Sequence, residues 1–281
     1  MNIRFNLKML FIKKSKNLIA GPYYGEFGWE LMSFQGYVRK LRKFYENVAV
    51  ISYNTSNYLY EKCIFFPHSL KLEKSSFGFG IYNEKLISEL SIKVAKELNF
   101  NDYDLFTPFH INRINKLLIG NQEFKKFYEP PIQNNKFDIV FHFRYLRRED
   151  GDKKNYNIEY IRKIFSYFEK NKYKIGFIGL PQYSYALGGE YDLRSNDLRY
   201  TISIISNSRL VVGGSSAPMH LAQLCDKPIV VWIGKEADID RYISYWNPFN
   251  SPVFVVSDKN WQPKPEEVIN KINEAIEKLN I

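Results

Sequence analysis

Apolar positions in the second half of the chain follow two alternating patterns, short continuous runs and longer runs with helical spacing. The continuous runs predict buried strands at 137–144, 172–180, 209–214 and 228–234. The runs with helical spacing predict helices at 157–171, 198–208, 216–226 and 263–280. Because strands that alternate with helices of this length are typical of parallel βαβ units, we expect a doubly wound α/β domain here.

The first half of the chain begins with the same pattern. Residues 16–20 predict a short buried strand, and the residues from Trp29 onward predict a helix. The buried face of that helix would carry Leu31, Phe34, Val38, Leu41 and Tyr45. A second strand is predicted at 47–52 and a second helix over 83–100.

The turn-rich stretch 101–135 ends in Pro130-Pro131, which favours a linker between domains. We therefore expect two Rossmann-like domains, 1–133 and 134–281, that face each other across a cleft. Ligands of such domains lie at the carboxyl ends of the strands.

Composition adds a preference for negatively charged partners. The 281 residues carry a net charge of +10, which suits a nucleotide, a phospholipid surface or a nucleic acid. The excess lies in scattered pairs such as KK and RK, so a solvated lysine-rich surface explains much of it. No apolar run approaches the length that spans a membrane. Cys63 and Cys225 predict reduced, buried thiols, so we expect a cytoplasmic protein, or one peripheral at the inner membrane surface.

The strongest local motif is 209-RLVVGGSSAPMHLAQLCDKPIVVWIG-234. Gly213 and Gly214 end a predicted strand and would let the backbone approach a ligand closely. Ser215 and Ser216 follow at a helix N-terminus, where free N–H groups and the helix dipole favour a phosphate. A plain N-cap in a βα turn is the structural alternative.

This motif resembles the donor-site turn of GT-B glycosyltransferases of the heptosyltransferase type, in which a helix carries an H-L-A stretch. His220, Leu221 and Ala222 match that stretch. The resemblance implies the GT-B fold, with 1–133 on the acceptor side and 134–281 binding a nucleotide sugar. It also implies a donor pocket lined by Gly213, Gly214, Ser215, Ser216 and His220.

A second motif, 139-IVFHFRYLRRED-150, carries a strand into a cluster of cations. Side chains alternate along a strand, so His142 and Arg144 would share a face. The planar fork of arginine binds phosphate oxygens in pairs and stays charged. The motif resembles the H-x-R segment of GT-B fucosyltransferases, which implies that Arg144, assisted by Arg147 and Arg148, holds the donor diphosphate. Surface pairs of these arginines with Glu149 and Asp150 are the alternative.

The loop 21-GPYYGEFGWEL-31 resembles the glycine-containing first loop of GT-B enzymes, which faces the acceptor. The resemblance implies an acceptor-side loop of Tyr24, Gly25, Gly28 and Trp29, with Glu26 as the base that takes the acceptor proton. Glu30 is the other candidate base, although a carboxylate in a first helical turn is also explained by the helix dipole. Weaker candidates without a distinctive context are Asp102, Asp104, His68 and His110.

The polar, tyrosine-rich loop 182–197 is a further candidate for contact with the donor nucleoside. Tyr183, Tyr185 or Asp192 could reach its base and ribose, and a plain surface loop is the alternative.

Metal chemistry has little support in the sequence. D-x-D triplets occur at 102–104, 150–152 and 238–240, but none directly follows a clear apolar strand, and the four histidines lack zinc-site spacing. We expect no divalent metal and no cofactor, because arginine and helix N–H groups can stabilise a leaving diphosphate.

These observations predict a glycosyltransferase, of the hexosyl or pentosyl class, that moves a sugar from a nucleotide sugar to an acceptor hydroxyl. An in-line base at Glu26 would invert the anomeric configuration. The acceptor expected from the resemblance is a glycan, and modified bases of duplex DNA are the alternative acceptor. Two other classes fit the same residues: a sugar-nucleotide epimerase or hydrolase, and a non-catalytic protein that binds phosphate groups or nucleic acid.

Overall fold

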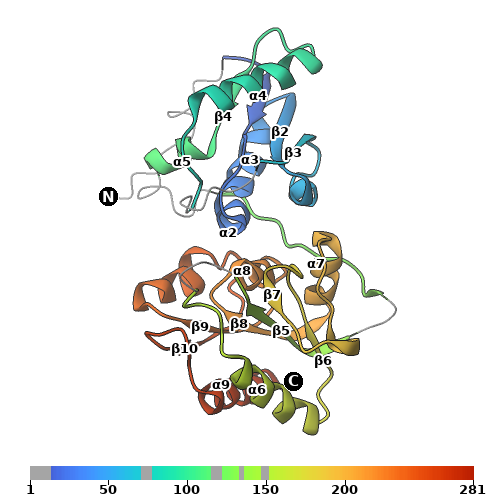
Figure 1. The fold of residues 1–281 in the computed structure, drawn as a ribbon. Helices are drawn as coiled ribbons and strands as arrows, with labels where there is room; N and C mark the ends of the chain where they lie inside the picture. Colours follow the sequence, from blue (N-terminus) through green and yellow to red (C-terminus); the bar gives the residue numbers. More distant parts are fainter. Residues whose placement is uncertain (1–13, 71–77, 115–121, 133–135, 147–151) are drawn as a thin grey trace. The chain divides into compact units, whose positions relative to one another are not determined.

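In this computed structural model the chain is described at residues 14–70, 78–114, 122–132, 136–146 and 152–281. It divides into two compact units, Met1–Phe124 and Lys125–Ile281 (Figure 1). The boundary precedes the diproline because residues after 124 pack on the second unit. The Phe127 N–H donates to the Leu224 carbonyl at 2.8 Å, and the Ser203 hydroxyl donates to the Pro130 carbonyl at 2.5 Å.

The first unit contains a parallel sheet of four strands in the order β3-β2-β1-β4. Its strands are β1 (Asn17–Ala20), β2 (Asn47–Tyr53), β3 (Ile64–His68) and β4 (Asp104–Phe106). All four residues of β1 are buried, as expected of a strand that pairs on both edges.

In the first unit a helical segment follows each of the four strands. Those after β1 form one helical stretch: α2 (Phe27–Trp29), the π-helical turn η1 (Glu30–Phe34), α3 (Gln35–Leu41) and the 3₁₀ turn η2 (Arg42–Phe44). The remaining ones are the 3₁₀ turn η3 (Asn54–Leu59), α4 (Glu84–Glu97) and α5 (Pro108–Ile114). The five apolar residues predicted for the face of the first helix are all buried. Val94 and Ala95 of α4 pack on β1 and β2 through Ile19 and Ile51.

The second unit contains a parallel sheet in the order β10-β9-β8-β5-β6, and the short strand β7 pairs antiparallel with the end of β5. Its strands are β5 (Phe137–Arg144), β6 (Ile175–Phe177), β7 (Ser184–Tyr185), β8 (Ser208–Gly214), β9 (Ile229–Ile233) and β10 (Val253–Ser257). Its helices are α6 (Ile158–Lys170), α7 (Leu198–Ser206), α8 (Ala217–Leu224) and α9 (Pro265–Leu279). Its shorter helical turns are η5 (Gly189–Tyr191), η6 (Glu236–Asp238) and the π-helical η7 (Arg241–Tyr245).

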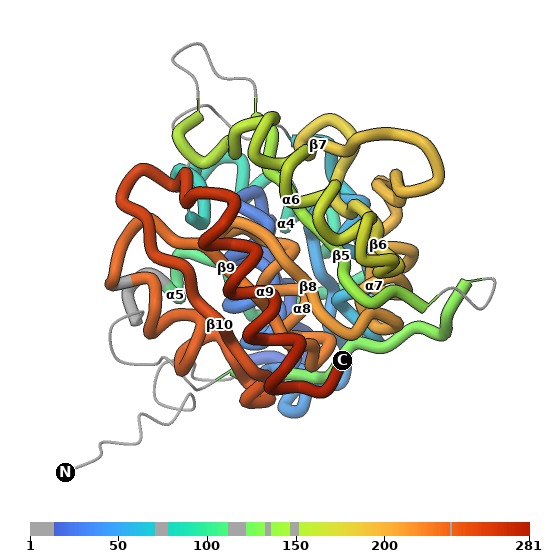
Figure 2. Tube along the Cα trace, turned by 90° about the horizontal axis from the view of Figure 1, so that it is seen from below, coloured from blue at the N-terminus to red at the C-terminus, as the bar shows by residue number. Residues whose placement is uncertain are grey.

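Helices cover both faces of this second sheet (Figure 1). In Figure 2, α9 lies in front of β8, β9 and β10, and it shares its layer with α6. Phe141 and Phe143 of β5 belong to the core beneath α6 and α9, so the strand pleat turns His142 toward the opposite face. None of the helices in the described part of the chain is long and apolar enough to cross a bilayer.

Each sheet contains one point at which the strand order reverses. In the first sheet it lies between β1 and β4, and in the second sheet between β5 and β8. Ligands of open α/β sheets bind beside the carboxyl ends of the strands at such points. The loop that contains Glu26 follows β1, and the Gly213–Ser216 turn lies at the end of β8, so both motifs lie at these positions.

Candidate functional site

The turn between β8 and α8 has Ser215 at its centre. The Ser215 N–H donates to the Trp232 carbonyl at 2.9 Å, and its hydroxyl accepts a hydrogen bond from the Tyr242 hydroxyl at 2.9 Å. Ser215 is buried; its backbone N–H fixes the turn to β9, and its side chain fixes the turn to η7. The backbone of this turn lies at the carboxyl edge of the second sheet.

Ser216 is the N-cap of α8, but its side chain does not cap the helix. Its hydroxyl donates to the Gly214 carbonyl at 2.8 Å and lies 3.0 Å from His142 Nδ1. Because a hydroxyl has one proton to donate, both contacts are satisfied when His142 Nδ1–H donates to Ser216 Oγ. Pro218 has no N–H, and the Met219 N–H donates to the Ser216 carbonyl at 3.1 Å. The Ala217 N–H therefore receives no side-chain acceptor from this serine, which leaves it suited to an anion at the positive end of the helix dipole.

Burial, and next to it the charge of Arg144, lowers the pKa of His142 to about 3. The imidazole is therefore neutral at physiological pH, and its proton lies on Nδ1, from which it donates to Ser216. It joins the end of β5 to the start of α8 across the point where the strand order reverses.

The two glycines at the end of β8 are explained by packing against the protein itself. A Cβ at Gly213 would lie 2.6 Å from the His142 carbonyl oxygen, and one at Gly214 would lie 2.7 Å from Trp232 Nε1. Neighbouring strands therefore occupy the space that a side chain would need at either position.

Arg144 lies at the last position of β5 and points one nitrogen at Asp152, with 2.8 Å between Nη2 and Oδ2. Its side chain is 20% exposed and the Asp152 side chain 6%. Arg144 Nε is buried and has no hydrogen-bond partner within the described residues. The guanidinium thus keeps donors that Asp152 does not use, at the same sheet edge as the α8 turn. Arg147 and Arg148 lie outside the described residues.

His220 packs behind the α8 turn and is 4% exposed. Its ring stacks on Tyr242 at 4.6 Å between centroids and meets Trp246 edge to face at 4.7 Å. Burial, and next to it the charge of Arg241, lowers the pKa of His220 to about 3. His220 therefore supports Tyr242, which in turn holds Ser215.

Two cations near the carboxyl ends of the strands of the second sheet were not predicted from the sequence. Lys154 Nζ lies 4.2 Å from the centre of the Trp261 ring, and Arg241 lies over Trp246 and pairs with Asp238 at 3.2 Å. Lys154 follows β5 and Arg241 follows β9. Their position shortly after predicted strands was the feature of the sequence that could have indicated them as candidates.

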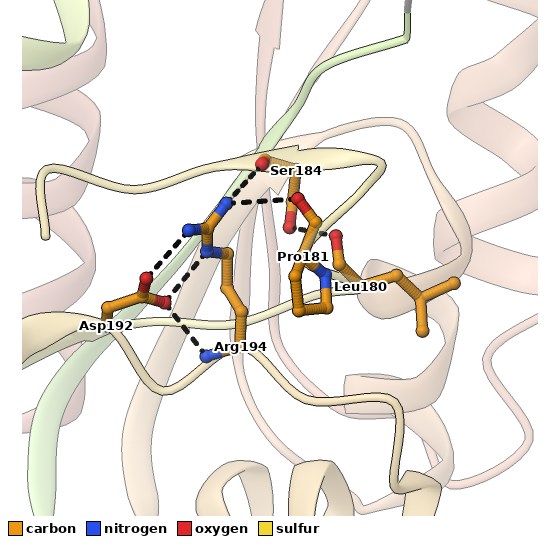
Figure 3. A network of polar contacts seen from close by, with 5 residues as sticks. All are labelled: Leu180, Pro181, Ser184, Asp192 and Arg194. Carbon is orange, nitrogen blue, oxygen red and sulfur yellow. Dashed lines mark hydrogen bonds and ion pairs between the residues drawn. The ribbon is translucent and has the colours of Figure 1, made fainter.

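A polar network fixes the loop between β6 and α7 beside Arg144 (Figure 3). The Arg194 guanidinium contacts both oxygens of Asp192, at 2.8 and 2.7 Å, and donates to the carbonyls of Ser184 and Pro181. These bonds to Arg194, together with its charge, hold the pKa of Asp192 below its usual value although partial burial opposes them. Asp192 therefore has a structural partner, while Tyr183 on the same loop remains 52% exposed.

In the first unit, the loop after β1 is held by hydrogen bonds to β2, β4 and residues 78–81. The Gly21 N–H donates to the Phe106 carbonyl at 2.8 Å, and the Tyr23 N–H donates to the Ile51 carbonyl at 2.9 Å. A Cβ at Gly25 would lie 2.3 Å from the Gly78 carbonyl oxygen, so this glycine permits close contact between two loops. Gly28 lies in α2, and Trp29 packs on Phe79 at 5.2 Å.

Glu26 is half-buried at the N-cap of α2. Its N–H donates to the Gly78 carbonyl at 2.7 Å, and its Oε2 accepts a hydrogen bond from the Gly78 N–H at 3.3 Å. A carboxylate has about four lone-pair sites, so this one bond leaves it able to accept a proton. It lies at the carboxyl edge of the first sheet, where the strand order reverses.

Glu30, the other candidate base, is fully buried. Its carboxylate accepts hydrogen bonds from the hydroxyls of Ser52, Ser56 and Tyr60. Burial raises the pKa of Glu30 to about 7, although these hydroxyl bonds oppose the rise. A carboxylate enclosed in this way is not accessible to an acceptor, and it joins η1 to β2 and η3.

The weaker candidates have structural partners. Asp104 accepts hydrogen bonds from the N–H groups of Lys14 and Ser15 and from the Tyr45 hydroxyl. His68 Nε2 lies 2.6 Å from the Tyr23 carbonyl, and His110 Nδ1 accepts from the Thr107 N–H at 2.9 Å. Asp102 is exposed.

Within the described residues, no group of three or more His, Cys, Asp or Glu side chains lies close enough together to hold a metal ion.

No model of a protein family matches this chain, and no curated protein matches it. Solved structures do. A glycosyltransferase family 9 protein from Veillonella parvula DSM 2008 has a TM-score of 0.61 and 12% identity, over 93% of this chain and 97% of that chain.

Two Escherichia coli structures are also similar. ADP-heptose LPS heptosyltransferase II has a TM-score of 0.56 and 13% identity, over 95% of this chain and 100% of that chain. The iron-containing dodecameric glycosyltransferase TibC has a TM-score of 0.52 and 12% identity, over 94% of this chain and 78% of that chain. At identities this low, the similarity shows the fold alone. The chain has the GT-B glycosyltransferase fold, with two units built on parallel sheets.

Proposed function

We propose that this protein transfers a sugar from a nucleotide-sugar donor to a hydroxyl group of a glycan acceptor. The observation that carries the proposal is the helix α8, whose first turn is uncapped by its serine and lies at the reversal point of the second sheet beside Arg144. The similar solved structures support it, since they are described as glycosyltransferases, one of them acting with ADP-heptose.

On the donor side, the α8 turn and Arg144 act on the diphosphate. The Ala217 N–H at the start of the helix donates to a phosphate oxygen, aided by the helix dipole. Arg144 adds a charge-assisted hydrogen bond from donors that Asp152 leaves unused. Ser215 and His142 act indirectly, by holding the turn against η7 and β5.

On the acceptor side, Glu26 removes the proton from the attacking hydroxyl. The acceptor oxygen forms a bond to the anomeric carbon as the bond from that carbon to the diphosphate oxygen breaks. The electron pair of the broken bond leaves with the nucleoside diphosphate, whose charge is stabilised by Arg144 and the N-terminus of α8. Attack opposite the leaving group inverts the anomeric configuration. In this proposal the reaction uses no divalent metal.

Nucleotide binding tests the donor site. Arg144→Gln alone would leave the buried Asp152 carboxylate without its cation, so the informative variant is Arg144→Gln with Asp152→Asn. Calorimetric titration with ADP, GDP, UDP and CMP should show binding of one nucleoside diphosphate. The double variant should weaken it about 10-fold or more, since a charge-assisted bond contributes about 1.5–3 kcal/mol.

The matched control is Arg162→Gln, which removes a cation from an exposed pair with Glu159 and should leave binding unchanged. The proposal is contradicted if no nucleotide binds, or if the double variant binds as tightly as the unaltered protein.

Acceptor dependence separates this function from its rivals. An epimerase or hydrolase would consume the nucleotide sugar without an added acceptor. A DNA acceptor would show strongly salt-dependent binding to duplex DNA, because phosphate neutralisation releases counterions.

A further inference from the structure

A row of aromatic side chains extends from the core of the first unit to its surface. Tyr24 is 8% exposed, Phe109 is half-buried and Tyr82 is 58% exposed. The rings of Tyr24 and Phe109 lie 5.9 Å apart, and those of Phe109 and Tyr82 lie 5.2 Å apart at 83°. Ile81, next to Tyr82, is 47% exposed, so the row ends in an apolar surface.

The row lies at the reversal point of the first sheet. Tyr24 belongs to the loop after β1, and Phe109 belongs to α5, directly after β4. The two strands are neighbours, and the Gly21 N–H donates to the Phe106 carbonyl just beyond their pairing. An exposed aromatic ring therefore lies where α/β sheets bind ligands.

Hydrogen bonds connect the row to Glu26. The Tyr24 hydroxyl donates to the Ile81 carbonyl at 2.7 Å, and the backbone of Gly78 exchanges hydrogen bonds with Glu26. A Cβ at Gly80 would lie 2.9 Å from the Tyr24 ring, so the segment from Gly78 to Ile81 packs closely on the Glu26 loop. The segment that leads to Tyr82 is thus bonded to the loop that contains Glu26.

The other side of Tyr82 is fixed as well. Asn83 caps α4, and its side chain accepts a hydrogen bond from the Leu86 N–H at 3.0 Å. An exposed ring held between two anchored neighbours is pre-organised, so binding a ligand there costs little ordering of the chain.

Folding leaves more than half of the Tyr82 side chain in water, and a pre-organised apolar surface on a segment bonded to a carboxylate loop is typical of a ligand site. A pyranose ring matches the apolar surface and the carboxylate, because one face presents C–H groups and its rim presents hydroxyls. We propose that Tyr82, with Phe109 and Ile81, forms an acceptor subsite that stacks a pyranose ring and brings its hydroxyl to Glu26. This inference rests on the proposed function, since the stacked ring is the acceptor or its neighbour in a glycan.

Saturation-transfer NMR tests the subsite directly, with the methyl α- and β-pyranosides of glucose, galactose and mannose as probes. We expect saturation of the C–H protons on one ring face. Tyr82→Ala should reduce that signal at least fivefold, while Tyr82→Phe, which keeps the ring, should retain it. Tyr128→Ala removes another exposed tyrosine, 61% exposed in the second unit, and should have no effect.

Nucleotide titration of the same proteins keeps the two proposals separate. Tyr82→Ala should bind the nucleoside diphosphate as the unaltered protein does. If the nucleotide binds but no pyranoside is saturated, or if Tyr82→Ala keeps the full signal, the subsite is wrong and the donor site stands. If pyranosides bind through Tyr82 and no nucleotide binds, the subsite stands and the transferase proposal fails.

Discussion

At the scale of single residues, Glu26 and Glu30 show how burial decides what a carboxylate can do. Both lie in one short motif, and Glu30 N–H even donates to the Glu26 carbonyl at 3.2 Å. Glu26 is half-buried at a reversal point, while Glu30 is enclosed by three hydroxyl groups. The sequence predicts both as candidates, but burial depends on the packing of distant residues such as Ser52 and Tyr60.

Glu30 should make stability depend on pH. Its pKa is raised from 4.5 to about 7 by burial, so its contribution to the free energy of unfolding is fully present below pH 4.5 and is lost as pH rises toward 7. Glu30→Gln is neutral throughout, so the stability difference between the two proteins should shift by on the order of 3 kcal/mol over this window. Urea unfolding at a series of pH values measures it. Parallel stability curves for the two proteins would show that Glu30 does not titrate there.

At the scale of elements, Arg194 holds the tyrosine-rich loop against β5. Its guanidinium supplies hydrogen bonds to two carbonyls and both oxygens of Asp192, which an ammonium group cannot reproduce (Figure 3). Arg194→Lys should therefore loosen the segment from Leu180 to Tyr185. We expect its amide hydrogen exchange to rise roughly 10-fold, as for loss of one charge-assisted bond. Arg162→Lys on the exposed face of α6 is the control, and equal exchange in both variants would contradict the role of Arg194.

The elements that could be predicted from the sequence are those with long, regular apolar patterns. β5, β8 and β9 are buried on both faces, so their continuous apolar runs were clear, as were the faces of α4, α6 and α9. β3, β4, β7, α5 and β10 were not predicted. β3 is mostly half-exposed and contains Pro67, and β4 and β7 are very short. The π-helical turn at Glu30 has no signature in the apolar spacing.

The candidate site was predictable only in part, because the sequence indicates which residues end strands but not which distant residues they contact. The α8 turn and Arg144 could be predicted because their motifs end predicted strands, and the carboxyl ends of parallel strands carry ligands. The pairing of Arg144 with Asp152 and the occupied space beside Gly213 arise from contacts between separate strands and loops. Tyr82 gave no signal, because the connection between its segment and the Glu26 loop depends on contacts between residues far apart in the chain.

At the scale of the whole molecule, the two units repeat one arrangement. Each has a parallel sheet, a single reversal of strand order, and a motif with candidate chemistry at that point. The first unit offers a carboxylate and aromatic rings, and the second offers cations and an uncapped helix. These are the complementary requirements of an acceptor hydroxyl and a diphosphate leaving group.

The most direct test of this account is the fate of the sugar diphosphate bond. A panel of nucleotide sugars is incubated with and without a mixture of glycans, donor loss is followed by ³¹P NMR, and the anomeric configuration of the product by ¹H NMR. We predict that one nucleotide sugar is consumed and that it is consumed only when glycan is present. The anomeric configuration of the product should be inverted relative to the donor. Glu26→Gln should slow the consumption about 100-fold or more, while Glu30→Gln should not. Donor loss without glycan, retained configuration, or full activity in Glu26→Gln would contradict the account.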